Sequence, residues 1–176
     1  MAALSFTLGG AVYPLGHLQS FRVRVPQSDP LRAPAVLQVT FSNHAYTEKW
    51  DGEKHPVEHR IAANKEVRAF CPVRYGCSIN LRTLIDYHVR GKAFEGRDSQ
   101  GAMNRFFYAE ADSIPYPIYF GLGRASQITG VDGILHVISA YQNPAMLARH
   151  RFQSIKFARL VHQACPPKPQ NNSPSV

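Results

Sequence analysis

The sequence contains no apolar run long enough to cross a membrane. A transmembrane helix needs roughly 20 consecutive apolar residues, and the 176-residue chain has no such stretch. Its first residues also lack the basic segment that opens a secretory signal. We therefore expect a soluble, cytoplasmic protein without a membrane partner.

Cysteine is scarce, and several cofactor motifs are missing. The three cysteines, Cys71, Cys77 and Cys165, are too few and odd in number to form a disulfide framework. Cys71 and Cys77 stand further apart than the paired ligands of a zinc knuckle. The chain also lacks a P-loop, a dinucleotide-binding loop and a nucleophile elbow. We expect reduced thiols, no cofactor and no metal.

Acidic residues are few, and none follows Asp132. The formal net charge of +8 favours polyanionic partners such as nucleic acid. The C-terminal stretch carries the basic residues that we predict to contact a nucleic-acid backbone, namely Arg149, Arg151, Lys156 and Arg159. The alternative is an ordinary solvated basic face.

The composition is that of one globular domain, with 44% hydrophobic and 18% charged residues. We predict a domain over residues 1–165 and a disordered tail over residues 166–176, where Ser, Pro and Asn dominate. Alternating or β-prone patterns predict strands at residues 4–8, 17–25, 35–41, 104–111, 116–122 and 134–141.

Helical spacing is clearest over residues 78–89, with Ser78 as the expected N-cap and Gly91 as the stop. Residues 42–65 are polar and are predicted to be loop with at most a short helix. Residues 154–163 fit neither the strand nor the helix period. Short turns between neighbouring strands imply an α+β fold, in which one main helix packs on one face of an antiparallel sheet.

Three segments carry residues suited to acid–base or phosphate chemistry. His44 follows a predicted strand, where an imidazole can exchange protons or simply cap the strand end. Alternation places Val137, Ser139 and Tyr141 on one face, so the two hydroxyls either bind a phosphate or pack in the core. Arg68 and Arg74 could bind phosphate, or they could be ordinary surface arginines or pair with an acid in the core.

A fourth segment, His55 to His59, matches the H-x-x-E-H pattern of inverted zinc peptidases. That motif needs both histidines on one helical turn. Pro56 is tolerated only at the first helical position, so His55 would be a cap rather than a helical ligand. A zinc hydrolase using His55 and His59 is therefore the weakest alternative.

Taken together, the spaced motifs resemble a group of bacterial and prophage proteins. The resemblance covers residues 37–160. Its motifs are Phe41-Ser-x-His44-x-x-Thr47, Arg68-x-Phe70, Arg74-Tyr75-x-x-Ser78, Ile138-Ser-Ala-Tyr141 and Ile155-Lys-Phe157. The chain departs from that group at Asn43-His44-Ala45, where the group commonly has His-His-Cys. An activity that depends on the first His would be lost here.

The chain is also distantly similar to the barnase–EndoU–colicin–RelE-like nuclease superfamily, whose members are small α+β domains. That resemblance implies a metal-independent endoribonuclease of toxin type, with RNA as substrate and a neutralising antitoxin or immunity protein as a further partner. It also implies roles for five residues. His44 would be the acid or base, Arg68 or Arg74 would hold the scissile phosphate, and Ser139 and Tyr141 would line the site.

A different class of function fits the same residues. In a non-catalytic module that binds nucleic acid or protein, the basic C-terminal stretch would hold a backbone and exposed aromatics would stack on bases. The two hypotheses differ in what His44 does. The nuclease needs His44, whereas the binding module needs the basic residues and should weaken with salt.

Overall fold

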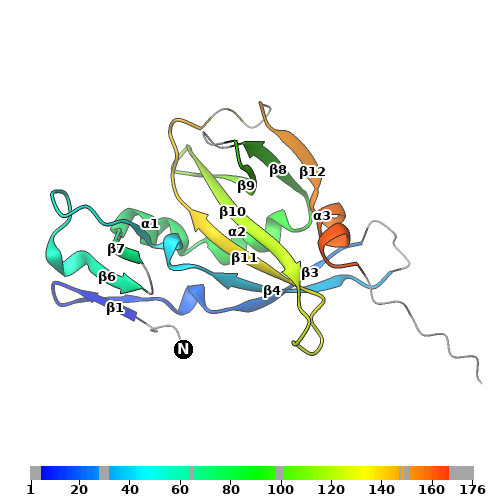
Figure 1. Cartoon of the computed structure of the whole chain (residues 1–176), viewed down its shortest axis with the longest axis horizontal. Helices are drawn as coiled ribbons and strands as arrows, with labels where there is room; N and C mark the ends of the chain where they lie inside the picture. The colour runs from blue at the N-terminus through cyan, green and yellow to red at the C-terminus, as the bar shows by residue number, and fades with distance from the viewer. Residues whose placement is uncertain are drawn as a thin grey trace, which may run out of the picture.

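The computed structural model describes residues 5–27, 32–63, 66–97, 101–146, 148 and 151–166, and its strands form three sheets (Figure 1). The main sheet has seven strands in the order β12-β8-β9-β10-β11-β4-β3. These are β3 (Phe21–Val25), β4 (Ala35–Phe41), β8 (Lys92–Arg97), β9 (Met103–Ala111), β10 (Ile114–Arg124), β11 (Gly133–Ala140) and β12 (Gln153–Lys156).

Most neighbours in the main sheet run antiparallel, but β4 and β11 run parallel. Their register pairs Leu37 with Gly133 and Phe41 with Val137. Parallel strands end at the same edge of a sheet, so the segments that follow β4 and β11 start side by side. The parallel pairing of β4 and β11 therefore brings together the two segments that form the candidate site.

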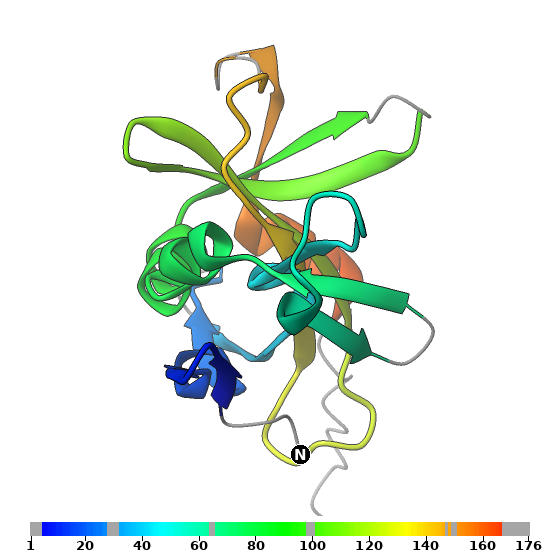
Figure 2. The same cartoon turned by 90° about the vertical axis from the view of Figure 1, so that its left-hand side faces the viewer.

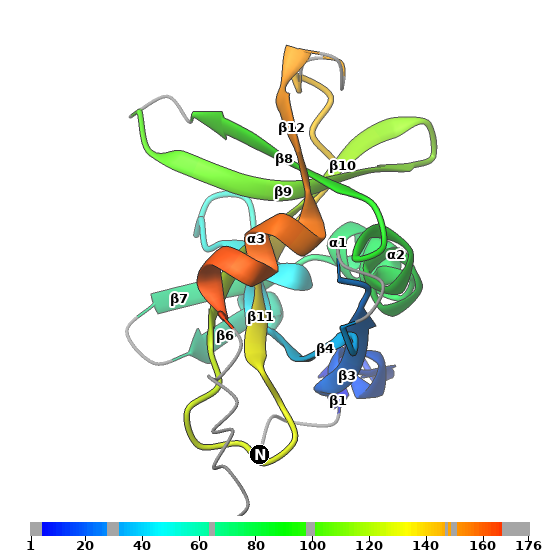
Figure 3. The same ribbon diagram turned by 90° about the vertical axis from the view of Figure 1, so that its right-hand side faces the viewer.

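Two helices cover one face of the main sheet. In α2 (Leu81–His88), Leu81 and Ile85 are fully buried, and α3 (Phe157–Ala164) buries Phe157 at the same core. Phe157 packs edge-on against rings of β9 and β10, and Figure 3 shows α3 lying across the sheet. The opposite face carries a smaller aromatic cluster of Phe94, Phe106 and Tyr108.

Two small sheets lie at the other end of the molecule, which Figure 2 views end-on. One is a three-stranded antiparallel sheet of β5 (Thr47–Lys49), β7 (Glu66–Phe70) and β6 (Arg60–Ala63), with α1 (Pro72–Ser78) following β7. The other is the hairpin of β1 (Ser5–Leu8) and β2 (Ala11–Pro14), in which Phe6 stacks on Phe70 at 4.6 Å.

These observations confirm the α+β class and the mostly antiparallel sheet. The alternation in residues 21–25 is also confirmed, because Val23 and Val25 are buried between exposed arginines. No helix among the described residues is long and apolar enough to cross a membrane. Residues 167–176, most of the predicted tail, lie outside the described part of the chain.

The helix predicted over residues 78–89 corresponds to α2, which begins only at Leu81. Ser78 ends α1 rather than capping α2, and its hydroxyl is buried, donating to the Tyr75 carbonyl and contacting His17 at 2.7 Å. Asn80 occupies the N-cap of α2, and Gly91 follows the helix end as expected. The prediction of Ser78 as an N-cap was wrong because its hydroxyl already has partners in α1 and at His17.

The polar segment 42–65 is more ordered than predicted. It contains β5, β6 and the 3₁₀ turns Asn43–Ala45 and Val57–His59. Strands of three or four residues leave too short a pattern to show a period. Residues 154–163 fit neither period because they span the junction of β12 and α3.

Candidate active site

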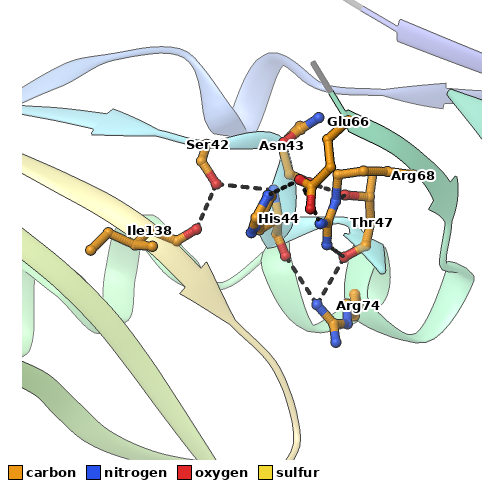
Figure 4. A network of polar contacts seen from close by, with 8 residues as sticks. All are labelled: Ser42, Asn43, His44, Thr47, Glu66, Arg68, Arg74 and Ile138. Carbon is orange, nitrogen blue, oxygen red and sulfur yellow. Dashed lines mark hydrogen bonds and ion pairs between the residues drawn. The ribbon is translucent and has the colours of Figure 1, made fainter. Parts of the chain in front are cut away.

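The end of β4 holds His44 in a short turn. Ser42 begins the 3₁₀ turn Asn43–Ala45, and its hydroxyl accepts from the His44 amide at 3.0 Å (Figure 4). The same hydroxyl donates to the Ile138 carbonyl, and the Ser42 amide donates to the Val137 carbonyl at 2.9 Å. The turn that carries His44 is therefore attached to the end of β11.

Thr47 connects this turn to β7. Its fully buried hydroxyl donates to the Asn43 carbonyl at 2.7 Å and accepts from Arg68 Nε at 2.7 Å. Arg68 is only 5% exposed, and its other donors reach the Thr47 carbonyl and Glu66. The Arg68 guanidinium thus faces into the protein, where it positions Glu66 and the turn rather than offering a fork to a ligand.

His44 and Glu66 meet at the surface of this network. His44 Nε2 lies 3.3 Å from Glu66 Oε2, with the His44 side chain 34% exposed and the Glu66 side chain 58% exposed. Hydrogen bonding from Arg68 lowers the pKa of Glu66. Burial lowers the pKa of His44 below 6.5, and the Arg68 charge adds to that, although Glu66 opposes it. The imidazole is therefore mostly neutral at neutral pH and can accept a proton.

Arg74 joins three parts of the site. From the first turn of α1, its Nη1 donates to the Thr47 carbonyl at 2.8 Å and to the His44 carbonyl at 3.4 Å. Its guanidinium carbon lies 4.7 Å from the centre of the Tyr141 ring, within range of a cation–π contact. Arg74 consequently links the His44 turn with the residue that follows β11.

A groove of about 650 Å³ runs beside this network on the face away from the helices, lined in part by Tyr119, Ser139 and Tyr141. The rings of Tyr119 and Tyr141 are stacked, with their centres 6.0 Å apart. Burial, with the charge of Tyr141 and a hydrogen bond to it, raises the pKa of Tyr119 to about 12. The groove therefore presents stacked phenol rings and hydroxyls.

The strand β11 departs from the expected alternation. Tyr119 pairs with Ser139 but Phe120 pairs with Val137, so Ile138 is an extra residue in a β-bulge. Val137 is fully buried in the core, whereas Ser139 lines the groove. The prediction that Val137 shares a face with Ser139 and Tyr141 was wrong, because the bulge reverses the alternation after Val137.

The basic residues predicted to bind nucleic acid lie elsewhere. Lys156 and Arg159 line a second pocket, of about 630 Å³, together with Gln27, Arg32, Gln153, Ser154, Ile155 and His162. This pocket lies at the α3 end of the molecule, opposite the end formed by β6 and β7 (Figure 1). Arg151 is exposed but does not line it, and Arg149 lies outside the described residues.

The His55 and His59 segment does not form a zinc-peptidase helix. Val57–His59 is a single 3₁₀ turn with Pro56 at its N-cap, so His55 precedes the turn. His55 contacts Glu48 at 3.2 Å, while His59 Nδ1 lies 3.0 Å from the Phe70 carbonyl. Within the described ranges, no group of three or more His, Cys, Asp and Glu side chains is arranged to hold a metal ion.

A comparison with protein families gives one match, to the profile of the YjaZ family over residues 5–165. The chain belongs to the YjaZ family. Comparisons with curated proteins and with solved structures gave no match. YjaZ membership confirms the coarser part of the resemblance, that to a bacterial family, and leaves the nuclease superfamily as a proposal.

Of the five site residues predicted in this YjaZ-family chain, His44, Arg68 and Arg74 lie in one network, and Ser139 and Tyr141 line the adjoining groove. Sequence reasoning missed Glu66, which contacts both His44 and Arg68. Its position two residues before Arg68 was the available signal, since residues i and i+2 of a strand share a face. It went unnoticed because β7 was not predicted.

Proposed function

We propose that the protein is a metal-independent endoribonuclease of toxin type. The observation that carries this proposal is that Arg74 lies next to both His44 and Tyr141, which come from separate segments: it donates to the backbone carbonyl of His44 at 3.4 Å and lies 4.7 Å from the centre of the Tyr141 ring. The three side chains together supply what RNA cleavage by the 2′-hydroxyl requires: a proton acceptor, a cation for the phosphate and a hydroxyl. A metal ion is not needed for these roles.

In the proposed reaction His44 acts as the base. Its contact with the Glu66 carboxylate favours the proton on Nε2 and leaves Nδ1 as the acceptor. Nδ1 takes the proton of the ribose 2′-hydroxyl while the 2′-oxygen forms a bond to the adjacent phosphorus. The bond from phosphorus to the 5′-oxygen breaks, which yields a 2′,3′-cyclic phosphate and a free 5′-hydroxyl end.

Arg74 and Tyr141 complete the reaction on the groove side. Arg74 Nη1 is held by two carbonyls, so the guanidinium is fixed in orientation before the substrate arrives. It neutralises the charge that builds up on the phosphate oxygens. Tyr141 donates the proton that the leaving 5′-oxygen takes up, and Ser139 holds the phosphate from the same groove.

The distant sequence resemblance to the barnase–EndoU–colicin–RelE-like nucleases, small α+β domains many of which are toxins, is a further reason for this proposal. If this function is correct, the protein acts on cytoplasmic RNA and a neutralising antitoxin or immunity protein accompanies it. Asn43 stands where the bacterial and prophage group that the motifs resemble commonly has the first His of His-His-Cys. In this chain the proposed proton transfer therefore depends on His44.

The proposal is tested by incubating purified protein with total RNA in buffer containing EDTA. Wild type should cut RNA, and His44→Ala and Tyr141→Phe should each lose about 100-fold or more in rate. His136→Ala is the matched control, because the exposed His136 forms a hydrogen bond with Thr40 away from the His44 network, so this variant should cut normally. Wild-type cleavage rates in both site variants would remove these residues from the mechanism.

A second function is favoured by the basic pocket at α3. Among the described residues, its lining includes Arg32, Lys156, Arg159 and His162 but no carboxylate, which suits a phosphate backbone rather than a reaction. A non-catalytic nucleic-acid-binding module would use this pocket alone. Lys156→Ala with Arg159→Ala would then abolish RNA binding, while His44→Ala would leave it unchanged. Intact binding in the double variant would exclude this function.

A further inference from the structure

The groove beside the proposed reaction site has a floor that lacks side chains. Alternation along β10 places Tyr119, Gly121 and Gly123 on the same face of the strand, and the first two of them line the groove. Among the described residues, a Cβ on Gly121 would have one neighbour within 4 Å, the end of the Ile138 side chain at 3.9 Å. The φ angle of Gly121 is not positive either. Neither crowding nor backbone conformation therefore requires a glycine here.

A glycine at this place has a cost for the fold. Gly121 lies inside β10, where it pairs with His136 of β11. Glycine weakens the interior of a strand, because it adds no packing and loses more conformational freedom on folding than any other residue. Such glycines often mark a place where a ligand approaches the backbone closely. The missing side chain leaves open the floor of a groove of about 650 Å³.

The walls of the groove are aromatic and apolar. Tyr119 and Tyr141 contribute half-buried rings. Ile138 and Met103 line the groove as well and are 46% and 51% exposed, so large apolar side chains face solvent there. The guanidinium of Arg105, another lining residue, donates to a neighbouring carboxylate at 2.8 Å, and no carboxylate of the described residues lines the groove. Such a lining favours a flat, uncharged ring over a charged group.

We propose that the groove binds an unpaired nucleobase, so that the substrate of the protein is single-stranded RNA. The base stacks on the ring of Tyr119 above the open floor at Gly121, in the way that aromatic side chains hold bases of single strands. A base within a duplex is already paired and stacked, and its faces are not accessible to a protein ring.

This inference rests on the proposed nuclease function, which it deepens. The Tyr119 ring lies 6.0 Å from the ring of Tyr141, and Tyr141 lies against Arg74. A base that stacks on Tyr119 is therefore close to the phosphate that Arg74 holds in the proposed reaction. Base binding and cleavage would thus take place on adjoining parts of one surface.

The test measures the binding of a fluorescent 2′-O-methyl oligonucleotide to the full chain by anisotropy. The methyl group blocks the attacking hydroxyl, so the probe stays intact and binding is measured whether or not the protein cuts RNA. The single strand should bind more tightly than the same strand annealed to its complement. It should also bind more tightly than an abasic strand of equal length and charge. Equal affinity for the abasic strand would overturn the proposal.

Gly121→Val fills the floor of the groove. Valine suits a strand, so thermal unfolding should occur at or above the wild-type temperature, while the affinity for the single strand should fall by about tenfold. Gly123→Val is the matched control, because Gly123 is exposed two residues further along β10, does not line the groove and should bind as wild type does. Equal affinity of Gly121→Val and wild type would mean that the oligonucleotide binds elsewhere, such as at the basic pocket.

Tyr119→Leu tests the stacking surface without filling the groove. The affinity should fall by about tenfold, as expected for the loss of one base–aromatic contact. Tyr87→Leu is its control, since Tyr87 is an exposed tyrosine of α2 that does not line the groove. Unchanged binding in Tyr119→Leu would overturn the stacking role. Failure of the nuclease function would instead appear as unmodified RNA left uncut by wild type in EDTA, with the differences in binding retained.

Discussion

The two ends of the molecule use charge in opposite ways. At the end formed by β5, β6 and β7, Arg68 and Arg74 are tied to carbonyls and a carboxylate, and His44 lies against Glu66. At the α3 end, Lys156 and Arg159 are exposed, and no carboxylate of the described residues lines their pocket. One set of charges is compensated and fixed in geometry, and the other is available to solvent.

This difference indicates a division of work. Compensated, hydrogen-bonded groups hold fixed positions, which a chemical step needs because the barrier depends on geometry. Exposed surface cations act at longer range and depend on salt, which suits holding a polyanion in many positions. Under the proposed nuclease function, the reaction takes place at the His44 end and the RNA backbone binds at the α3 end.

The largest effect is expected for Arg74→Ala. The proposed reaction loses the cation at the phosphate, so the cleavage rate should fall by about 100-fold or more. Arg82→Ala is the matched control, because Arg82 also stacks on an aromatic ring, that of Phe21, but lies away from the groove. Single-turnover cleavage of RNA measures the rate of both variants. An equal loss of rate in Arg74→Ala and Arg82→Ala would mean that Arg74 supports the structure rather than the reaction.

Arg68→Met should act on stability. The substitution removes the donors that pair with the Thr47 hydroxyl and Glu66, in a side chain that is almost wholly buried. We expect a loss of about 2 kcal/mol in the free energy of unfolding. Arg90→Met breaks an exposed ion pair with Asp86 and should cost less than about 0.5 kcal/mol. Urea unfolding that gave the two variants the same midpoint would contradict the buried role of Arg68.

Replacing both Lys156 and Arg159 by alanine should change the salt dependence of RNA binding. Each phosphate contact contributes about one to the slope of log affinity against log salt, so the slope should decrease by about two. Fluorescence anisotropy with a labelled single-stranded RNA at several salt concentrations gives the slope. An unchanged slope would mean that the backbone is held elsewhere.

The smallest effect is a shift in the pH profile. The pKa of His44 is held below 6.5, so the rate should fall only when the pH drops below that value. The stability of the protein should change in the same direction. Because the pKa of His44 is lower in the folded than in the unfolded chain, the unfolded chain takes up the proton at a higher pH. The free energy of unfolding therefore decreases as the pH falls from about 6.5 toward the folded pKa. Because Glu66 raises the pKa of His44, Glu66→Gln should move the acidic limb to still lower pH. A limb that moved to higher pH would contradict this contact.

Local patterns were enough to predict the central strands. Residues 35–41 and 134–141 are rich in β-prone residues, and both form strands in the structure. Pairing was less predictable, because short turns between later strands suggested antiparallel neighbours throughout. The parallel pair of β4 and β11 joins strands far apart in sequence, and no local pattern encodes it.

That same pair explains why the site could be predicted only in pieces. His44 was a candidate because it follows a strand, and Tyr141 because alternation placed it on one face with Ser139. Only the parallel pairing of β4 and β11 brings the ends of both strands to one edge. Glu66 was missed with the small sheet to which it belongs. The basic residues close to Tyr141 in sequence, such as Lys156, proved to lie at the other end, because β12 and α3 carry the chain away.

The assignment of chemistry to one end and capture to the other is tested most directly by steady-state cleavage of a defined RNA. The account predicts that His44→Ala lowers kcat with little change in KM. It also predicts that the Lys156 and Arg159 double alanine variant raises KM and leaves kcat close to wild type. The opposite pattern, with kcat lost in the double variant and retained in His44→Ala, would contradict the division between the two ends.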